Sequence, residues 1–410
     1  MSADADPPSD GPAQTVGSPS HGPLHGLKII EFTHMVMGPS VGVILADLGG
    51  EVIKVEPLDG DATRRLKGSG AGYFPMYNRN KKSIRLDLKS AGGLDVAKRL
   101  AGWADVLIEN FRPGALQRLG LGYAALSADN PRLIYCSAKG FLPGPYQDRT
   151  ALDEVAQMMG GLAYMTGPPG RPLRAGASVI DVTGGMFGVI GILAALEQRH
   201  VTGLGQQVDC SLFETTAFLV GQHIAQKAVT GEAARPMPAR ISAWAIYDVF
   251  DTADGDQVFV GVVSDSQWKS FCEIFDEADW ARDEALTLNN QRVAARDRII
   301  PRLRDRFAAM PKAELLKRCE AANLPFAPIA TPDDLVADPH LLASGGLVTV
   351  TTEAGVRAEL PALPLRMDGH RAGLHHDVPR SGEHSREILS DILGLDAGGI
   401  AALQDAGAVA

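Results

Sequence analysis

The alternation of two patterns through the first 140 residues constrains the fold most strongly. Apolar runs at 27–32 and 51–56 are typical of buried strands, and the segment 39–49 between them has the apolar spacing of a helix. A helix between two strands returns the chain to the edge where it started, so the strands run parallel. We therefore predict an α/β fold with a doubly wound parallel sheet. It would include further strands at 82–88, 105–110 and 132–141 and a helix at 92–104.

A change of pattern near residue 230 predicts a second, smaller α/β domain. Residues 240–263 alternate apolar and polar side chains around an Asp254–Gly255 pair, which is typical of a β-hairpin. A chain of 410 residues is also longer than a single core usually supports. The predicted organisation is a disordered tail at 1–22, the first part of a large domain at 23–229, a small domain at 230–330, and a return segment at 331–410 that completes the large domain.

Composition and motifs disfavour several classes of protein. The formal net charge of −10 argues against nucleic-acid and anionic-membrane partners. The four cysteines form no CxxC pair, which favours a cytoplasmic location without a metal site or disulfide framework. No uninterrupted apolar run of about 18 residues is evident, so we expect no membrane span. The first βα turn, FTHMVMGPS, lacks GxGxxG, and no Walker sequence is present, which disfavours nicotinamide and ATP chemistry.

A basic stretch in this acidic chain is the best candidate for holding phosphate groups, although such stretches are often only solvated faces. Its members are Arg64, Arg65, Lys67, Arg79, Lys81, Lys82, Arg85 and Lys89.

A single carboxylate, Asp181, interrupts the apolar stretch ASVIDVTGGMFGVIGILAAL at residues 177–196. The pattern predicts a strand-like run, a small-residue turn and then a helix. One interpretation is that Asp181 is the N-cap of this helix. The other is that N–H donors keep the carboxylate ionised while the neighbouring glycines leave room for a substrate, which makes Asp181 a nucleophile or base. The two interpretations are compatible.

Several stretches together resemble the class III CoA-transferases, the CaiB/BaiF family. The resemblance extends over nearly the whole chain after residue 24, and RISAWAIYDVF and VSDSQW are similar to members that act on short dicarboxylates, the succinyl-, mesaconyl- and itaconyl-CoA group. The resemblance implies a large Rossmann-like domain built from both ends of the sequence, with a smaller α/β domain between them. It also implies an obligate homodimer of interlocked chains, with CoA entering as a substrate and not as a cofactor. The stretches are GLKIIEFTHMVMGP, ADLGGEVIKVEP, NRNKKSIRLDLK, DVLIENFRPGALQRLGLGY, CSAKGF, LDEVAQMMGGLAYMTG, VIDVTGGMFGVIGILAALEQRHVTGLGQQVDCSL and GEHSREIL.

The resemblance implies a role for individual residues. Asp181 matches the catalytic aspartate, which would form an acyl anhydride and then an aspartyl-CoA thioester with the help of N–H groups at the helix start. Positions that match CoA contacts or their surroundings are Leu86, Lys89, Asn110, Phe111, Arg118 and Asp153. The residues expected near the small carboxylic acid are His34, Val36, Arg240 and Ser242.

Departures from the family pattern leave alternatives open. Leu152 stands where the racemase branch has a histidine, and it cannot exchange a proton, which disfavours a 2-methylacyl-CoA racemase or epimerase. Val36 stands where the formyl-CoA/oxalate branch has a glutamine, which disfavours oxalate. A non-catalytic acyl-CoA-binding protein, with Asp181 only a cap, is a further alternative. Two basic residues of the family are replaced by Pro57 and Thr150; candidates to replace them are Arg64, Lys139 and Arg149.

Overall fold

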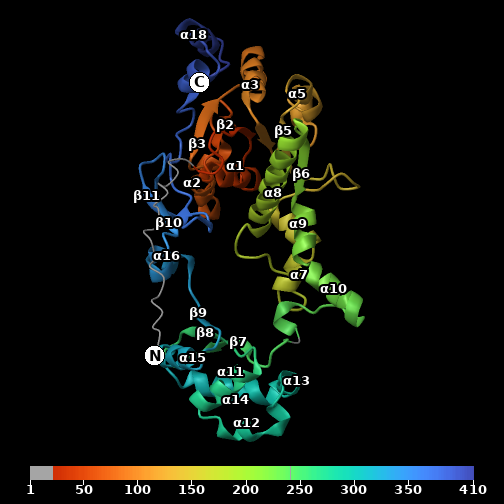
Figure 1. Cartoon of the computed structure of the whole chain (residues 1–410), viewed down its shortest axis with the longest axis vertical. Coiled ribbons are helices and arrows are strands. Elements are labelled where there is room, and N and C mark those ends of the chain that lie inside the picture. The colour runs from red at the N-terminus through yellow and green to blue at the C-terminus, as the bar shows by residue number, and fades with distance from the viewer. Residues whose placement is uncertain (1–21, 241) are drawn as a thin grey trace, which may run out of the picture. The chain divides into compact units, whose positions relative to one another are not determined.

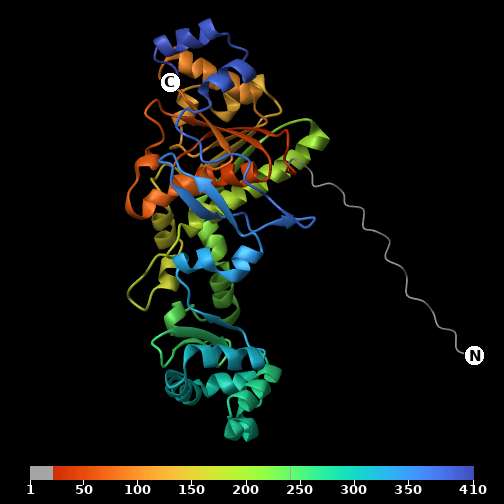
Figure 2. The ribbon, with the colours of Figure 1, turned by 90° about the vertical axis from the view of Figure 1, so that its left-hand side faces the viewer.

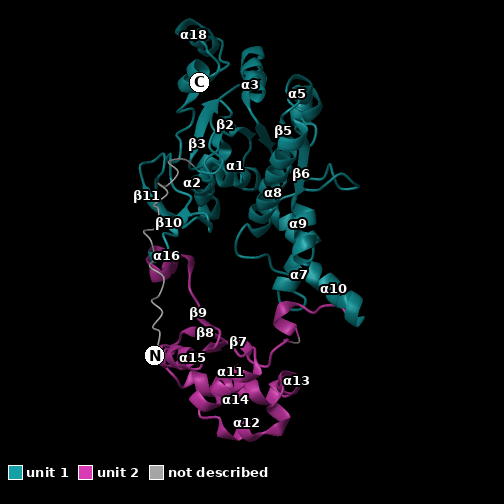
Figure 3. Ribbon diagram, viewed as in Figure 1, with its two compact units in different colours: residues 1–232, 343–410 teal, residues 233–342 magenta. Residues whose placement is uncertain are grey.

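The computed structural model describes residues 22–240 and 242–410 (Figure 1). Two compact units make up the chain: unit 1 is residues 1–232 together with 343–410, and unit 2 is residues 233–342 (Figure 3). The second division falls after residue 342, whereas the sequence predicted it after 330. The predicted disordered tail lies, up to residue 21, outside the described residues.

Unit 1 contains a six-stranded parallel sheet with the strand order β3-β2-β1-β4-β5-β6. The order reverses between β1 and β4, which is the arrangement of a doubly wound sheet. This confirms the predicted α/β class and parallel sheet. The strands are β1 (Lys28–Phe32), β2 (Glu51–Glu56), β3 (Lys81–Arg85), β4 (Val106–Glu109), β5 (Ile134–Lys139) and β6 (Gln207–Ser211).

Helices cover both faces of this sheet. Helices α1 (Met37–Asp47) and α8 (Val179–Thr202) lie side by side on one face in both Figure 1 and Figure 2, where they pack on apolar residues such as Ile29. The next residue along β1, Ile30, points to the other face, because side chains alternate along a strand. There it meets α3 (Ala91–Trp103), α5 (Tyr123–Asp129) and α18 (Ala397–Asp405).

The glycines that follow Asp181 let α8 approach α1. A Cβ on Gly185 would lie 2.9 Å from the Met37 carbonyl oxygen and 2.9 Å from the Ser40 Cβ, and a Cβ on Gly184 would lie 2.8 Å from the Met37 Cε. These distances are shorter than van der Waals contact. The prediction that these glycines leave room for a substrate is therefore wrong at Gly184 and Gly185, which instead fit the neighbouring helix.

Enlarging Gly185 is expected to destabilise the protein. Gly185→Val places its Cβ against the α1 backbone, which cannot move aside as a side chain can, so we expect the free energy of unfolding to fall by about 1–3 kcal/mol. The matched control is Gly221→Ala, because nothing lies within 4 Å of that Cβ. Urea unfolding monitored by circular dichroism measures both. Equal stability of the two variants would contradict this account of the α1–α8 contact.

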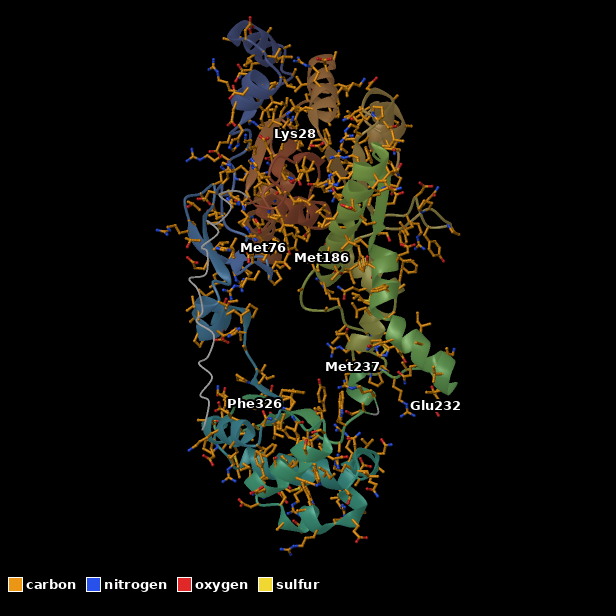
Figure 4. The ribbon with its side chains drawn as sticks, viewed as in Figure 1. Lys28, Met76, Met186, Glu232, Met237 and Phe326 are labelled. Atoms are coloured by element: carbon orange, nitrogen blue, oxygen red, sulfur yellow. The ribbon has the colours of Figure 1, made fainter. Side chains whose placement is uncertain are left out.

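Helix α8 has the length and apolar composition that could cross a membrane. It is the only helix within residues 22–240 and 242–410 that meets both criteria. Asp181 and four glycines interrupt its apolar residues, so the helix does not contain an uninterrupted apolar run of about 18 residues. Core helices pass the same test, and α8 packs against α1, β5 and β6. Its other side carries exposed apolar side chains, among them Met186, labelled in Figure 4.

The C-terminal segment returns to the sheet of unit 1. The Asp87 amide donates to the Ala408 carbonyl, and Leu86 forms an isolated antiparallel bridge with Val409. The remaining elements of unit 1 are η1 (Ala62–Arg65), η2 (Gly68–Gly72), α2 (Tyr73–Tyr77), α4 (Ala115–Arg118), α6 (Asp153–Met159), α7 (Leu162–Thr166), α9 (Leu212–Leu219), α10 (Gly221–Thr230), β10 (Leu347–Thr351), β11 (Arg357–Pro361), β12 (Arg366–Met367), β13 (His370–Arg371), α17 (Ser385–Glu387) and η6 (Ile388–Ile392).

Unit 2 has its own apolar core, which includes Trp268, Trp280 and Phe307. The predicted hairpin is confirmed, with Gly255 in its turn at a φ of +81° that favours glycine. The strands are β7 (Tyr247–Asp251), β8 (Gln257–Gly261) and β9 (Phe326–Pro328), and the helices are η3 (Met237–Ala239), α11 (Asp265–Ile274), α12 (Ala278–Arg282), η4 (Glu284–Leu286), α13 (Asn289–Ala294), α14 (Arg296–Ala308), α15 (Lys312–Ala321) and η5 (Pro332–Ala337). Helix α16 (Pro339–Ala343) spans the division between the units.

Candidate active site

A cavity of about 210 Å³ lies in unit 1 where several parallel strands end. Residues 34–37 follow β1, Asn110 follows β4, and Lys139 is the last residue of β5; all of them line it. Asp181, in the first turn of α8, lines the same cavity. In doubly wound sheets, ligands bind at the carboxyl ends of the strands where the strand order reverses, and β1 and β4 flank that point here.

Asp181 is the third residue of α8 and not its N-cap, which is Ser178. The amides of Ile180 and Asp181 both donate to Oδ2 of Asp153, at 2.8 and 3.1 Å. Asp153, buried at the start of α6, therefore caps α8 from a neighbouring helix. The N-cap interpretation of Asp181 is wrong, and these two amides are occupied, so they are not open donors for an oxyanion.

The carboxyl group of Asp181 is left without a hydrogen-bond donor among the described residues. The pKa of Asp181 is raised to about 7, chiefly by burial and in addition by the negative charge of Asp153, while the positive charge of Arg174 opposes the shift. The expectation that N–H donors keep Asp181 ionised is therefore wrong. A carboxylate that is buried and not hydrogen-bonded has a higher pKa, and its ionised form is a stronger nucleophile than an ordinary carboxylate.

The raised pKa of Asp181 predicts that activity increases with pH. Only the ionised form attacks, so kcat/KM for the acyl-CoA donor should rise about tenfold per pH unit below a pKa of about 7 and level off above it. The folded-state pKa lies above the unfolded value of 3.8, so this group's contribution to stability is lost as the pH rises from about 4 to about 7. Asp181→Asn should remove that loss. A kcat/KM that stays constant from pH 5.5 to 8.5 would contradict the prediction.

The loop after β1 is held in an unusual conformation. Met35 has a φ of +63°, which is uncommon for a residue other than glycine, and its amide donates to Thr63 Oγ1 at 3.1 Å. The side chain of Asn110 holds His34, the residue before Met35, through two hydrogen bonds. Its Oδ1 accepts from the His34 amide at 3.0 Å, and its Nδ2 donates to the His34 carbonyl at 2.8 Å. The Asn110 side chain therefore holds the loop backbone and also lines the Asp181 cavity, and its predicted contact with CoA stays a prediction. Val36 follows with a side chain that is only 1% exposed.

A second cavity, of about 480 Å³, lies on the other side of this loop. It shares His34 and Met35 with the Asp181 cavity and is lined by Pro57, Phe111 and Arg118. The structure thus brings most of the predicted residues of unit 1 to two cavities that meet at the His34–Met35 backbone.

Four predicted residues line neither of these two cavities of unit 1. Leu86 is 2% exposed within the apolar core, so its side chain is not available for the predicted contact with CoA. Lys89 is exposed and lines neither cavity. Arg240 and Ser242 belong to unit 2, where the Arg240 guanidinium donates to the Met237 carbonyl and the Ser242 Oγ accepts from the Trp244 amide.

Most of the basic stretch is used in pairs within the protein. Arg64 makes a two-bond contact with Glu56 and a third bond to Glu353, Arg79 is paired with Asp47, and Lys81 is paired with Glu31. The interpretation of these residues as a phosphate site is wrong, because ion pairs already neutralise their charges.

Two of the three candidates for the missing phosphate contacts are likewise unavailable. Arg64 is bound as described, and the Lys139 ammonium lies 2.6 Å from both the Glu109 carboxylate and the Phe111 carbonyl. Arg149 remains exposed, beside the ring of Tyr146.

The sequence reasoning missed Arg174 and Tyr73, which also line the Asp181 cavity. It also missed Tyr77, whose pKa is raised to about 12 by burial and by the nearby carboxylates of Asp181 and Asp153. Arg174 lies in the loop before α8, in the segment GRPLRAGAS. The only feature of the sequence that could have indicated Arg174 is that a basic residue stands seven positions before Asp181. Arg171 in the same loop is also basic, so this feature does not single out Arg174.

Comparison with known proteins gives a family. Residues 24–385 match CoA-transferase family III. The human "Succinyl-CoA:glutarate CoA-transferase" is 32% identical over 395 residues, which cover 94% of this chain and 90% of the relative. The "Formyl-CoA:oxalate CoA-transferase" of Streptomyces avermitilis is 33% identical over 394 residues, which cover 91% of this chain and 96% of the relative.

A solved structure shows the same fold. The crystal structure of a CaiB/BaiF family protein from Brucella suis is 33% identical, with a TM-score of 0.80, and the match covers 91% of this chain and all of the other. The chain therefore belongs to CoA-transferase family III, and it is an enzyme of the CoA-transferase class.

Proposed function

We propose that this enzyme moves CoA between short carboxylic acids, at least one of them dicarboxylic, through covalent intermediates on Asp181. The observation that carries the proposal is the Asp181 carboxyl. It lines a cavity, accepts no hydrogen bond from residues 22–240 and 242–410, and lies on a helix turn that Asp153 holds in place. A nucleophile needs an accessible lone pair and a fixed position, and this group has both.

Four steps return the enzyme to its starting state. The Asp181 carboxylate attacks the donor thioester carbonyl, the C–S bond breaks, and CoA leaves as a thiolate from the mixed anhydride. The thiolate attacks the aspartyl carbonyl and releases the donor acid. The acceptor carboxylate attacks the resulting aspartyl-CoA thioester and expels the thiolate again. The thiolate then attacks the acceptor's acyl carbon, which forms the new acyl-CoA and frees Asp181.

The two cavities support a path for the CoA substrate. The second cavity has a predominantly apolar lining, and Arg118 on α4 is exposed at it. We place the pantetheine arm there, with Phe111 beside it and Arg118 toward the phosphates, and the thioester beyond the His34–Met35 backbone next to Asp181. Leu86 is excluded from this path by its burial.

The dicarboxylate proposal is supported by the names of the relatives, which join succinyl-CoA to glutarate and formyl-CoA to oxalate. The test is a matrix of CoA esters against free acids, read by mass spectrometry of the CoA products. We expect transfer from succinyl-CoA to a second dicarboxylic acid. Transfer only among monocarboxylic acids would overturn the substrate class, and no transfer by any pair would overturn the proposed function.

We also propose that the working form is an obligate homodimer of interlocked chains. Helices α8, α9 and α10 expose apolar side chains that a monomer leaves in water, such as Ile190, Phe218 at 71% exposure, and Val229. A surface of this kind fits a subunit contact. Light scattering at micromolar concentration should give twice the mass of the chain, and a folded, active monomer would contradict the proposal. The four buried, free cysteines fit the proposed cytoplasmic location.

A further inference from the structure

Three basic side chains line the Asp181 cavity, and two of them are not free cations. Lys139 is neutralised by Glu109 at 2.6 Å and also donates to the Phe111 carbonyl. His34 has a pKa lowered by burial, so its imidazole is neutral near pH 7. Arg174, the third, is also ion-paired, with Glu154, but its Nη2 donates no hydrogen bond within residues 22–240 and 242–410, so it keeps donors for a carboxylate that enters this cavity.

The hydrogen bonds of Arg174 leave one edge of its guanidinium open. Nη1 donates to Oε1 of Glu154 at 2.8 Å, and Nε donates to the Ala175 carbonyl at 3.1 Å. The distance from Nη2 to Asp153 Oδ1 is 3.7 Å, which is too long for a hydrogen bond. The Arg174 side chain is 34% exposed and lines the cavity.

Asp153 does not require Arg174 as a partner. Its Oδ2 accepts the amides of Ile180 and Asp181, and its Oδ1 accepts from the Gln157 side chain. The carboxylate is thus hydrogen-bonded on both oxygens by other groups. The Nη2 donors of Arg174 can bind an incoming anion without leaving Asp153 unsatisfied.

We propose that Arg174 binds the non-reacting carboxylate of the acceptor acid and so selects dicarboxylic over monocarboxylic acids. This inference rests on the proposed function. Arginine suits the task because its planar N–H donors match a carboxylate and its charge persists at every working pH. Arg174 and Asp181 line the same cavity of about 210 Å³, so the acid that spans them has a short chain between its two carboxylates.

The test compares acceptors that differ only in the second carboxylate. The acceptors are glutarate and valerate, with succinyl-CoA as donor, for the wild type and for Arg174→Gln and Arg174→Lys. In a ping-pong reaction, kcat/KM for the acceptor reports only the acceptor half-reaction, so any effect on the donor cancels. Arg174→Gln should lower kcat/KM for glutarate roughly 10- to 100-fold, mainly through KM, and leave the value for valerate within about twofold. For Arg174→Lys we expect a smaller fall in kcat/KM for glutarate than for Arg174→Gln.

Glu154→Gln is the matched control, because it weakens the Arg174–Glu154 ion pair but keeps the cation in the cavity. We expect it to retain the preference for glutarate. Equal losses for glutarate and valerate in Arg174→Gln, or no loss for either, would overturn the inference. Failure of the proposed function looks different: the wild type would then transfer no CoA, or Asp181→Asn would remain active.

Discussion

Replacing Asp181 by asparagine is expected to abolish CoA transfer, with a fall in kcat of at least about 10³-fold. The amide nearly matches the carboxylate in shape, so α8 and its contacts with Asp153 should remain intact. What is lost is the anionic carboxylate oxygen that attacks the thioester, because a neutral amide is a much weaker nucleophile. The measurement is the initial rate of acyl-CoA formation, with Asp181→Ala as a second variant because asparagine can revert to aspartate by deamidation.

Binding and stability separate this loss from misfolding. CoA affinity, measured by calorimetry, should stay within a fewfold of the wild type, because Asp181 lines only the smaller cavity. The free energy of unfolding at pH 8 should not fall, since the variant avoids ionising a buried group whose pKa is about 7. Full turnover by both variants would contradict the proposed role of Asp181.

Replacing Asp153 by leucine should reduce both stability and activity. The substitution leaves the amides of Ile180 and Asp181 without their acceptor in a buried setting, which is expected to lower the free energy of unfolding by about 2 kcal/mol or more. The first turn of α8 then loses its fixed position, and with it the orientation of Asp181. We expect kcat to fall roughly 10²-fold. Chemical unfolding and steady-state rates measure the two effects.

Asp153→Asn is the informative partner of this variant. Its amide oxygen can still accept from the α8 amides, but the negative charge is removed. Because that charge raises the pKa of Asp181, the increase of kcat/KM for the acyl-CoA donor with pH should occur at lower pH in Asp153→Asn than in the wild type. If this increase of kcat/KM occurs at the same pH or at a higher pH, Asp153 does not act on Asp181 through its charge.

The parallel sheet could be predicted from the sequence because its signals are local. The apolar pattern of residues 51–56 predicted the bounds of β2 correctly. The predicted bounds differ by a few residues from the observed ones for β1, α1, α3, β4 and β5. The role of Gly184 and Gly185 was not predictable in this way. Their constraint comes from α1, about 140 residues earlier in the chain, and a short-range pattern carries no information on that contact.

The position of Asp181 was predicted, but its environment was not. A carboxylate near a helix start suggests a low pKa, whereas Asp153 takes the amides that would have lowered it. The prediction that the basic stretch binds phosphate groups was wrong for a similar reason. The acidic partners of Arg64, Arg79 and Lys81 lie on other elements and neutralise their charges. Charge counted along a sequence does not show which charges are already paired.

The central claim is that Asp181 becomes covalently acylated, and trapping that intermediate tests it most directly. The enzyme is incubated with succinyl-CoA and no acceptor, quenched with hydroxylamine, digested, and analysed by mass spectrometry, with Asp181→Asn as control. We predict an aspartyl hydroxamate on the peptide that contains residue 181 in the wild type, and none in the variant. An unmodified Asp181 peptide from enzyme that transfers CoA under the same conditions would contradict the account.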